Sequence, residues 1–341
     1  MTTQYCSIGQ ATELAQRWET ILLAAGMAPK TIKNYMSWAN RMAKRWDVLS
    51  EATFDEMVML ASASLRRQAY SATTIHGFQC AMSRFSRDIW GWNAEQSDTL
   101  IRARPNKTVH TVPSVDEVSK FLDILHGDAK IIGLLCYCCG VRISEAVQLQ
   151  LADINLTTGI MNITTSKGAK GRKVPIPPEM TDMLRERVEK SLAICEADLM
   201  TGNIAAPLKD REYARRPSRA AEPGQWPVFP QDSLVYDGRA KMSVRVFVHA
   251  SVIEKQFAAA RLTSKVLTRI TPHRLRDAFA VHSLLGGVLI VTIQERMGHA
   301  TIETTAKYLA WLLTEEAAKD IPALNLFRQL SPQPETAAAA I

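Results

Sequence analysis

Apolar and polar side chains alternate with a helical period over most of the first 104 residues. Between Ile32 and Trp46, for example, apolar residues recur at intervals of three and four positions, which places them along one face of a helix. The pattern predicts helices over residues 8–26, 29–47, 53–67 and 71–90. Amphipathic helices of this length can bury one small core between them. We therefore expect residues 1–104 to form a separate helical domain.

The helical pattern lapses after this segment and resumes with a clear start signal. Residues 105–113 contain two prolines and are predicted to be an interdomain linker. Ser114 then begins a helix, since Glu117 three positions later completes a capping box. A strongly apolar helix follows and is predicted to stop at Gly140. A second domain therefore begins at residue 114.

Strand-like alternation occurs over residues 159–177, with a turn rich in Lys and Gly at its centre. This pattern predicts a β-hairpin. Helices are expected on its C-terminal side over residues 178–193 and 246–262. The predicted fold class is therefore mainly α with a small antiparallel β-sheet (α+β) in the second domain.

The second domain is expected to span residues 114–330. Within it, residues 196–245 are rich in Pro, Gly and Arg and are predicted to be an insertion. That insertion is either a loop that binds a partner or a tolerated segment with partial order. Residues 331–341 are predicted to be a disordered tail.

Composition narrows the class of protein without identifying it. A length of 341 residues favours two domains, and a net charge of +7 suits a polyanionic partner. Cys136 and Cys139 form a C-x-x-C motif, but no second pair of ligands stands at a suitable spacing. We therefore expect packed thiols and no metal site. No apolar run is long enough to span a membrane, so a cytoplasmic protein is expected.

The candidate chemistry lies in residues 271–311. His273 and Arg276 stand one helical turn apart, the pair Gly298-His299 follows, and Tyr308 comes nine residues after His299. Neither a phosphate-binding glycine loop nor a Ser or Cys nucleophile motif accompanies them. Cationic and imidazole groups that converge on one phenol are suited to the attack of a tyrosine on a phosphodiester.

Two earlier segments carry related groups. Arg142 begins a short helix, and Glu145 one turn later could brace its guanidinium group. The alternative is a surface ion pair that contributes a few tenths of a kcal/mol. Lys167, at the predicted hairpin tip, could deliver a proton to a leaving oxygen or simply rest on a phosphate.

The ordered motifs resemble those of the tyrosine site-specific recombinases, which include phage integrases and Cre-like and Xer-like enzymes. The motifs are G-V-R-I-S-E around Arg142, S-K-G-A-K-G-R around Lys167, H-R-L-R at 273–276, M-G-H-A around His299, and Tyr308. They cover residues 114–312, whereas the N-terminal helices match the family's core-binding domain by architecture only. Five elements in this order make the resemblance very specific.

The resemblance implies a role for each group. Tyr308 would be the nucleophile, with His273 as its base, and Lys167 would protonate the leaving 5′ oxygen. The oxygens of the phosphate would be held by Arg142, Arg276 and His299, with Glu145 as the supporting acid. Arginine suits such a clamp because its guanidinium binds two oxygens at once. The product would be a 3′-phosphotyrosyl enzyme, formed without cofactor, metal or ATP.

The resemblance also implies partners and architecture. Two domains would form a C-shaped clamp around double-stranded DNA at specific recombination sites, and four subunits would assemble on paired sites, with residues 321–330 docking on a neighbour. Such enzymes act on mobile genetic elements and would associate with the nucleoid. The insertion could contact DNA or a neighbouring subunit. The basic residues expected to contact DNA are Lys33, Lys44, Arg45, Arg66, Arg67, Arg84, Lys170 and Arg172.

Two departures from the family pattern stand out. Asp277 follows Arg276 where the family most often has His, so its carboxylate either tunes Arg276 or caps the local helix. The segment between Lys167 and His273 is longer than in compact Xer-type members, which is reminiscent of integron integrases. Two alternatives share these residues: a type IB topoisomerase-like enzyme, and a DNA-binding accessory protein with a retired active site.

Overall fold

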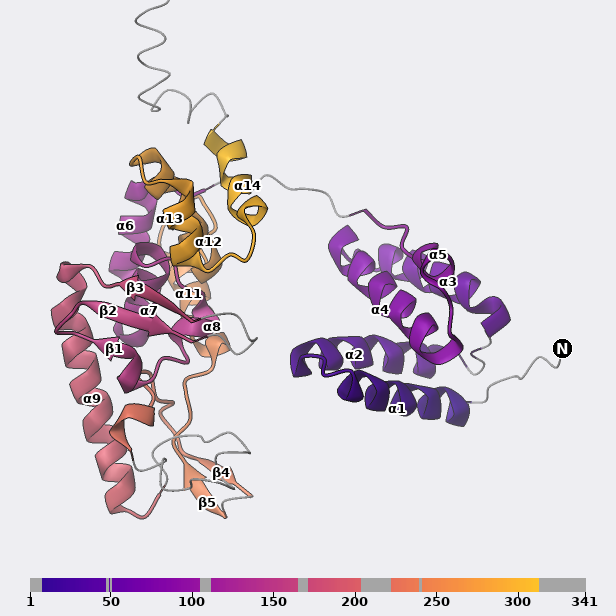
Figure 1. The fold of residues 1–341 in the computed structure, drawn as a ribbon, viewed down its shortest axis with the longest axis horizontal. Helices are drawn as coiled ribbons and strands as arrows, with labels where there is room; N and C mark the ends of the chain where they lie inside the picture. Colours follow the sequence, from indigo (N-terminus) through magenta and orange to yellow (C-terminus); the bar gives the residue numbers. More distant parts are fainter. Residues whose placement is uncertain are drawn as a thin grey trace, which may run out of the picture. The chain divides into compact units, whose positions relative to one another are not determined.

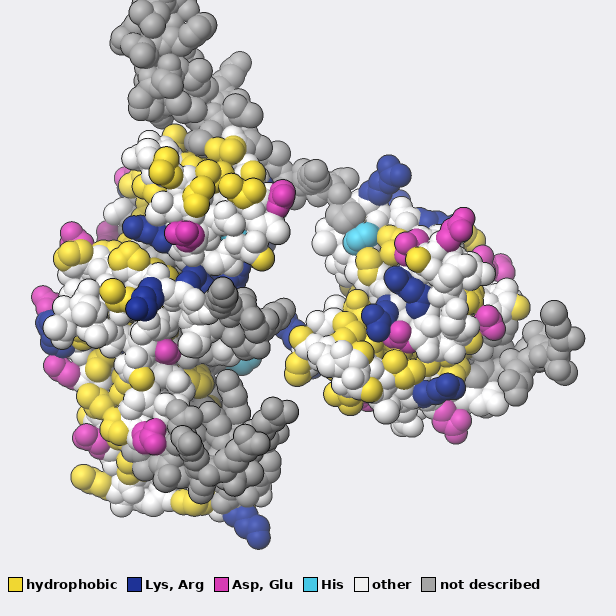
Figure 2. Space-filling model, viewed as in Figure 1, with side chains coloured by type: hydrophobic (Ala, Val, Ile, Leu, Met, Phe, Trp, Pro, Cys, Tyr) yellow, Lys and Arg dark blue, Asp and Glu magenta, His cyan; other side chains and the backbone are white. Residues whose placement is uncertain are grey.

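The computed structural model describes residues 8–46, 49, 51–104, 112–164, 171–203, 222–238 and 241–312. The chain divides into two compact units, Met1–Thr108 and Val109–Ile341 (Figure 1). On the face shown in Figure 2, the Lys and Arg side chains of both units are interspersed with apolar and acidic ones. No helix in the described ranges is both long and apolar enough to cross a membrane.

The N-terminal unit is helical. Its elements are α1 (Ile8–Ala24), α2 (Pro29–Arg45), the 3-10 turn η1 (Glu51–Thr53), α3 (Phe54–Arg67), α4 (Ala72–Trp90) and α5 (Ala94–Asp98). The four long helices match the predicted segments to within two residues at each end. Ser71 caps α4, because its hydroxyl oxygen accepts a hydrogen bond from the backbone N–H of Thr74 at 3.2 Å.

Aromatic side chains dominate the core of this unit. The fully buried Trp18 stacks on Tyr35 with 5.6 Å between ring centroids and meets the edge of Phe85 at 5.0 Å. Its indole N–H donates to Asp88 at 2.9 Å, so the one polar atom of the ring is satisfied. The amphipathic stripe read from the sequence is therefore the packing surface of the helices.

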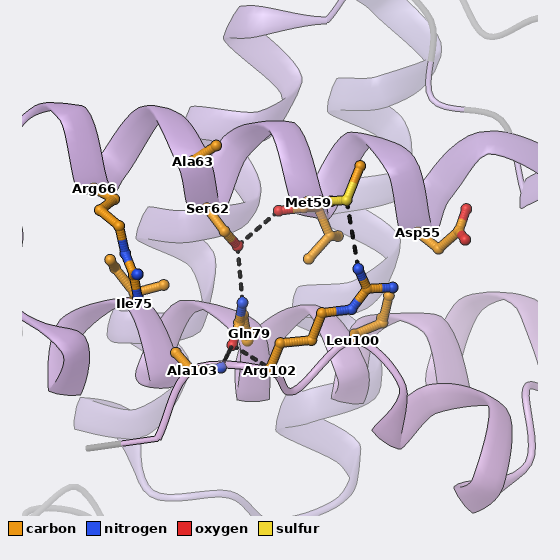
Figure 3. Close-up of a pocket in the computed structure, with 11 residues that line it drawn as sticks. Asp55, Met59, Ser62, Ala63, Arg66, Ile75, Gln79, Leu100, Arg102 and Ala103 are labelled. Atoms are coloured by element: carbon orange, nitrogen blue, oxygen red, sulfur yellow. Dashed lines mark hydrogen bonds between the residues drawn. The ribbon is translucent and has the colours of Figure 1, made fainter. Parts of the chain in front are cut away.

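Gln79 on α4 ties the end of this unit to its helices. Its side-chain oxygen accepts from the backbone N–H groups of Arg102 at 3.0 Å and Ala103 at 2.8 Å, and its amide donates to Ser62 on α3 (Figure 3). These residues line a pocket of about 350 Å³ between α3, α4 and residues 100–103. The chain thus remains part of the helical unit at least as far as Ala103.

The second unit holds most of the helices of the described chain. They are α6 (Val115–Ile124), α7 (Gly127–Cys138), α8 (Ile143–Ala146), α9 (Thr181–Met200), α11 (Ala250–Thr263), α12 (Pro272–Leu285), α13 (Ile290–Met297) and α14 (Ile302–Leu312). The capping box predicted at Ser114 and Glu117 is present at the start of α6. Cys136 and Cys139 are buried in the core, and burial raises the pKa of each thiol to about 12. Both thiols are therefore neutral packing groups, as the apolar surroundings predict.

Three short antiparallel strands form the main sheet, in the order β1-β2-β3. They are β1 (Ile154–Asn155), β2 (Ile160–Ile163) and β3 (Arg172–Pro175). Met161 lies opposite Val174, and both side chains are fully buried. The predicted hairpin is therefore confirmed at its strands, and the fold class is confirmed as mainly helical with small antiparallel sheets. Lys167 and Lys170 lie outside the described residues.

The segment predicted as an insertion packs closely where it is described. Helix α9 continues to Met200, seven residues past its predicted end, and the 3-10 turn η5 (Pro223–Gln225) lies within the same segment. Two other 3-10 turns of the unit, η2 (Leu151–Asp153) and η3 (Pro178–Met180), precede it. A two-stranded sheet, β4 (Val235–Asp237) with β5 (Met242–Val244), follows. Asp198 on α9 accepts two hydrogen bonds from the buried Arg245, at 2.6 and 2.7 Å. With Trp226 and Phe229 also buried, residues 226–230 belong to the core of the unit, whereas Val235 and Tyr236 on β4 are exposed.

Gly140 connects the buried helix α7 to the site. Its φ is +64°, and a Cβ at this position would lie 2.5 Å from the ring of Phe279 on α12. Its carbonyl accepts a hydrogen bond from the guanidinium group of Arg276. Glycine is therefore required both by the backbone conformation and by the approach of the neighbouring helix.

Replacing Gly140 by alanine is expected to destabilise this unit by about 2–4 kcal/mol, because an overpacked contact adds to the cost of a left-handed backbone. Gly287 is the matched control, since its φ is +82° but no atom lies within 4 Å of the added Cβ. Gly287→Ala should cost only about 1–2 kcal/mol. Hydrogen exchange of the α7 and α12 amides in urea measures the stability of both variants. An equal loss of stability in Gly140→Ala and Gly287→Ala would contradict the packing argument.

Candidate active site

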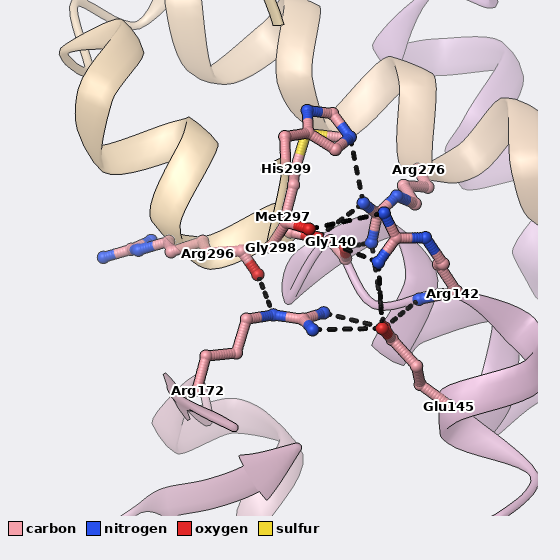
Figure 4. Close-up of polar contacts among 9 residues, drawn as sticks. All are labelled: Gly140, Arg142, Glu145, Arg172, Arg276, Arg296, Met297, Gly298 and His299. Carbon is pink, nitrogen blue, oxygen red and sulfur yellow. Dashed lines mark hydrogen bonds and ion pairs between the residues drawn. The ribbon is translucent and has the colours of Figure 1, made fainter. Parts of the chain in front are cut away.

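Arg276 lies at the centre of the site on α12. Thr271 caps this helix, because its hydroxyl accepts from the backbone N–H of Arg274, and Arg276 falls on the inner face with a 2% exposed side chain. Its guanidinium donates to the carbonyl of Gly140 and, at 2.6 Å, to that of Met297 (Figure 4). Burial and the charge of Arg142 lower the pKa of Arg276 to about 10, so it stays protonated at neutral pH.

Arg142 and Glu145 form the second part of the site. The backbone N–H of Arg142 donates to Glu145 at 2.8 Å, and the guanidinium donates to the same carboxylate at 2.9 Å. The guanidinium also donates to the carbonyl of Met297 at 3.3 Å, so it shares that acceptor with Arg276. The Glu145 side chain is only 9% exposed. The buried Glu145 therefore braces an Arg142 side chain that is itself 40% exposed, which differs from a surface ion pair with two solvated partners.

Arg172 on β3 is the other main partner of Glu145. Its guanidinium donates to both carboxylate oxygens, at 3.0 and 2.7 Å, and its Nε donates to the carbonyl of Arg296 at 2.7 Å (Figure 4). The side chain is 10% exposed, so the structure directs it inward and not toward the surface position expected of a DNA contact. Alternation along the strand could have predicted the inward direction of Arg172, because Arg172 shares a face with the buried Val174 whereas Lys173 is exposed.

The charge on Glu145 is strongly stabilised. Burial alone would raise the pKa of this carboxyl, but hydrogen bonds from Arg172 and from the backbone of Arg142, with the charges of both, lower it to about 2. Arg276 adds a third guanidinium, 3.9 Å from the carboxylate. Three guanidinium groups thus surround one carboxylate, and the cluster keeps an excess of positive charge.

His299 follows the left-handed Gly298 that ends α13. Its Nε2 lies 3.1 Å from a guanidinium nitrogen of Arg276, and its Nδ1 lies 2.8 Å from the hydroxyl of Thr305. Burial and the charge of Arg276 lower the pKa of His299 to about 4. The ring is therefore neutral; Nε2 accepts from Arg276, and Nδ1 carries the proton.

Tyr308 on α14 lies beside this cluster. Its side chain is buried, and its ring stacks near that of His299 with 6.4 Å between centroids. The hydroxyl donates to Asp277 at 2.7 Å. Burial and the negative charge of Asp277 raise the pKa of Tyr308 above its ordinary value. Asp277 thus has a contact that neither sequence interpretation of it, tuning of Arg276 or a helix cap, included.

His273 is placed less centrally than the sequence predicted. Its side chain is 72% exposed, and its Nε2 lies 3.9 Å from Asp277. Among the described residues it makes no hydrogen bond to Tyr308. The structure thus gathers five of the predicted residues closely, places His273 at their edge, and leaves Lys167 undescribed. The five are Arg142, Glu145, Arg276, His299 and Tyr308.

The predicted DNA-contacting cations of the N-terminal unit lie mostly on its surface. Exposed side chains belong to Lys33, Lys44, Arg45, Arg66 and Arg67. The C-terminal ends of α2 and α3 are close together, since Arg45 donates to Ser64 at 2.9 Å. Arg84 differs, because its guanidinium is paired with Asp88 at 2.8 Å. The exposed cations could bind phosphates or stabilise helix C-termini.

Comparison with known proteins identifies the family. Residues 114–313 match the phage integrase family, and the chain belongs to that family. It is 27% identical over 284 residues to an integrase/recombinase of Escherichia coli, covering 82% of this chain and 83% of that protein. It is 26% identical over 307 residues to the tyrosine recombinase XerA of Thermococcus kodakarensis, covering 88% and 92%.

Solved structures share the fold. A lambda integrase tetramer bound to a Holliday junction is similar with a TM-score of 0.63 and 15% identity, over 90% of this chain and 78% of that one. The Tn1549 transposon integrase in complex with transposon right end DNA has a TM-score of 0.63 and 12% identity, over 93% and 99%. The chain is a tyrosine recombinase, an enzyme of site-specific DNA recombination that breaks and rejoins DNA strands. Neither the topoisomerase nor the retired-site alternative is favoured by these matches.

Proposed function

We propose that Tyr308 is the nucleophile of this recombinase and that Arg142 and Arg276 hold the phosphate it attacks. The observation that carries this assignment is the carbonyl of Met297, which accepts hydrogen bonds from both guanidinium groups and so holds them side by side. The ring of His299 lies beside the guanidinium group of Arg276, and the ring of Tyr308 stacks near that of His299. Two fixed cations and a phenol from three different helices thus share one small site.

The chemistry follows from this arrangement. The phenol oxygen of Tyr308 attacks phosphorus, the bond to the 5′ oxygen breaks, and a 3′-phosphotyrosyl enzyme forms. Lys167 supplies the proton that the leaving oxygen needs. The ester conserves the energy of the broken bond, so the 5′ hydroxyl of another strand can reverse the step. Each preorganised cation that meets the developing charge is worth about 10²–10³ in rate.

The resting state of His299 suits a phosphate that arrives later. The ring is neutral because it is buried beside Arg276 and Arg142. A phosphate between these groups would offset their positive charge and raise the pKa of His299. The protonated Nε2 could then donate to a phosphate oxygen instead of accepting from Arg276. We therefore propose that His299 becomes protonated when the phosphate binds and then donates a third hydrogen bond to it, in addition to those of Arg142 and Arg276.

The remaining contacts with DNA extend over a larger surface. We propose that the two units form a clamp around double-stranded DNA at specific sites, with the exposed cations of α2 and α3 on its backbone. Four copies would assemble on paired sites, as the lambda integrase tetramer does on its Holliday junction. Residues 321–330, the proposed docking segment, lie outside the described residues. Since its substrate is DNA, we expect the enzyme to act at the nucleoid.

Covalent trapping tests the assignment of Tyr308. A duplex with a nick near the cleavage site loses the short 5′-hydroxyl fragment after cleavage, so the protein stays attached to the DNA. Candidate sites come from the DNA that flanks the gene. We expect a denaturant-resistant adduct that peptide mapping places on Tyr308. If DNA that the protein binds tightly yields no adduct, the assignment is wrong.

Arg172 is proposed as a positioning residue that holds Glu145 and the turn before His299. Replacing it by alanine should lower the cleavage rate about 10–100-fold, as for other residues that orient the groups of a site, with little change in DNA affinity. Arg172→Lys should recover little, because lysine cannot bind both carboxylate oxygens. The measurements are single-turnover cleavage and DNA binding at fixed salt.

The neighbouring Lys173 is the matched control for Arg172, because its side chain is exposed on the other face of β3. Lys173→Ala should cleave at close to the wild-type rate. A loss of affinity with an unchanged cleavage rate in Arg172→Ala would return Arg172 to the group of DNA-contacting residues.

A further inference from the structure

The hydroxyl of Tyr308 and the carboxylate of Asp277 form a buried contact. The two oxygens lie 2.7 Å apart, and only 6% of Tyr308 and 7% of Asp277 are exposed. Asp277 is on α12, immediately after Arg276, whereas Tyr308 is on α14. A buried carboxylate is costly unless it is paired, so this contact is a specific feature of the site.

The two oxygens of Asp277 face different surroundings. Oδ1 accepts from Tyr308, whereas Oδ2 lies 3.6 Å from the guanidinium of Arg274 and 3.9 Å from the Nε2 of His273. From α14, Lys307 also contributes a charge, with its Nζ 4.8 Å from the centre of the Tyr308 ring. Asp277 thus lies between the buried phenol and the exposed imidazole of His273.

A tyrosine nucleophile needs a proton acceptor in this environment. The ordinary pKa of a phenol is about 10, and burial with the charge of Asp277 raises the pKa of Tyr308 further. The hydroxyl is therefore protonated at neutral pH, and its proton must leave as the bond to phosphorus forms. In the described structure, the acceptor in hydrogen-bond contact with this hydroxyl is Asp277 and not His273.

We propose that Asp277 is the general base that takes the proton of Tyr308 during strand cleavage, an inference that rests on Tyr308 as the nucleophile. The O–H bond of Tyr308 breaks as a bond from its oxygen to phosphorus forms, and the proton passes to Oδ1 of Asp277. The bond from phosphorus to the 5′ oxygen breaks, and the leaving oxygen takes its proton from the acid assigned above to Lys167. In religation Asp277 returns the proton to the phenol oxygen. This assignment replaces His273, for which the family resemblance implies the role of base.

The alternative is that Asp277 only holds Tyr308 away from the phosphate. Asp277→Asn separates the two, because the amide oxygen can still accept the hydrogen bond of Tyr308 but cannot take up its proton. If Asp277 is the base, this variant should cleave about 10²–10⁴-fold more slowly at neutral pH, with DNA affinity unchanged. If Asp277 is only a restraint, the variant should cleave at the wild-type rate or faster.

The pH dependence gives a second readout. Without its base, the variant depends on the small fraction of phenolate, so its rate should rise about tenfold per pH unit up to the pKa of Tyr308. The wild-type rate should rise less steeply. The charged and titratable groups that face this pair are His273, Arg274 and Arg276 from α12, Lys307 from α14, His299 after α13, and Arg142 at the start of α8. A loss of rate that is equal at every pH would show a structural defect and overturn the proposal.

Single-turnover cleavage of the nicked duplex by the full chain is the experiment, with Asp277→Glu as the companion variant. Glutamate keeps a carboxylate, so Asp277→Glu should cleave faster than Asp277→Asn, and the reverse order would contradict a base. Mapping the wild-type adduct in the same assay keeps the two proposals apart. An adduct on Tyr308 with wild-type cleavage by Asp277→Asn refutes the base alone, whereas a wild-type adduct elsewhere refutes the nucleophile.

Discussion

Tyr308→Phe is expected to abolish the covalent protein–DNA complex and to leave DNA affinity unchanged. The variant loses the atom that would attack phosphorus, while the ring keeps its place in the apolar cluster that also includes Phe279 and Met297. It also leaves the buried Asp277 without its closest hydrogen-bond donor. We therefore expect a loss of about 1–3 kcal/mol in the free energy of unfolding, which urea denaturation would measure.

Tyr137→Phe is the matched control for this variant. The Tyr137 hydroxyl lies 2.9 Å from the Nδ1 of His282, so the substitution also removes one hydrogen bond in the same unit. Tyr137→Phe should form the adduct at the wild-type rate. If Tyr308→Phe still attaches covalently to nicked DNA, the nucleophile lies elsewhere in the chain.

Replacing Arg276 by alanine should also have a large effect on cleavage. We expect cleavage about 10²–10³-fold slower than wild type, because Arg276 is a fixed donor at the position where charge develops on the phosphate. DNA affinity should change much less, since it depends on many phosphate contacts spread over the protein. The carbonyl of Gly140 loses its Arg276 donor, whereas that of Met297 keeps Arg142. Stability should therefore also fall, by about 1–3 kcal/mol if the Gly140 carbonyl stays buried and unpaired.

Arg276→Lys and Arg296→Ala complete this test. Arg276→Lys keeps a positive charge but cannot bind two phosphate oxygens in parallel, so it should remain slow. The side chain of Arg296 points away from the cluster in Figure 4, although its carbonyl accepts from Arg172. Arg296→Ala should therefore cleave at close to the wild-type rate. An equal loss of rate and affinity in Arg276→Ala would make Arg276 a binding residue only.

The sequence alone was sufficient for the helices of the N-terminal unit, for the β2–β3 hairpin and for the main residues of the candidate site, but not for the end of α9 or the sheet of β4 and β5. Helix bounds in the N-terminal unit agree to within two residues, because amphipathic periodicity and caps such as Ser71 and Ser114 act within a single turn. The brace between Arg142 and Glu145 was also predictable, since both groups lie on one helical turn. The family motif then placed these residues in one site with Arg276, His299 and Tyr308.

Tertiary structure decided what each charged group faces. Arg172 carries the same charge as a DNA-contacting arginine, but the packing of β3 against α13 turns it toward Glu145. Asp277 and Tyr308 are 31 positions apart, and no local pattern joins them. Periodicity reports which face of an element is buried, whereas the partner of a buried charge depends on which elements pack together. Pairing across long separations therefore had to be read from the folded chain.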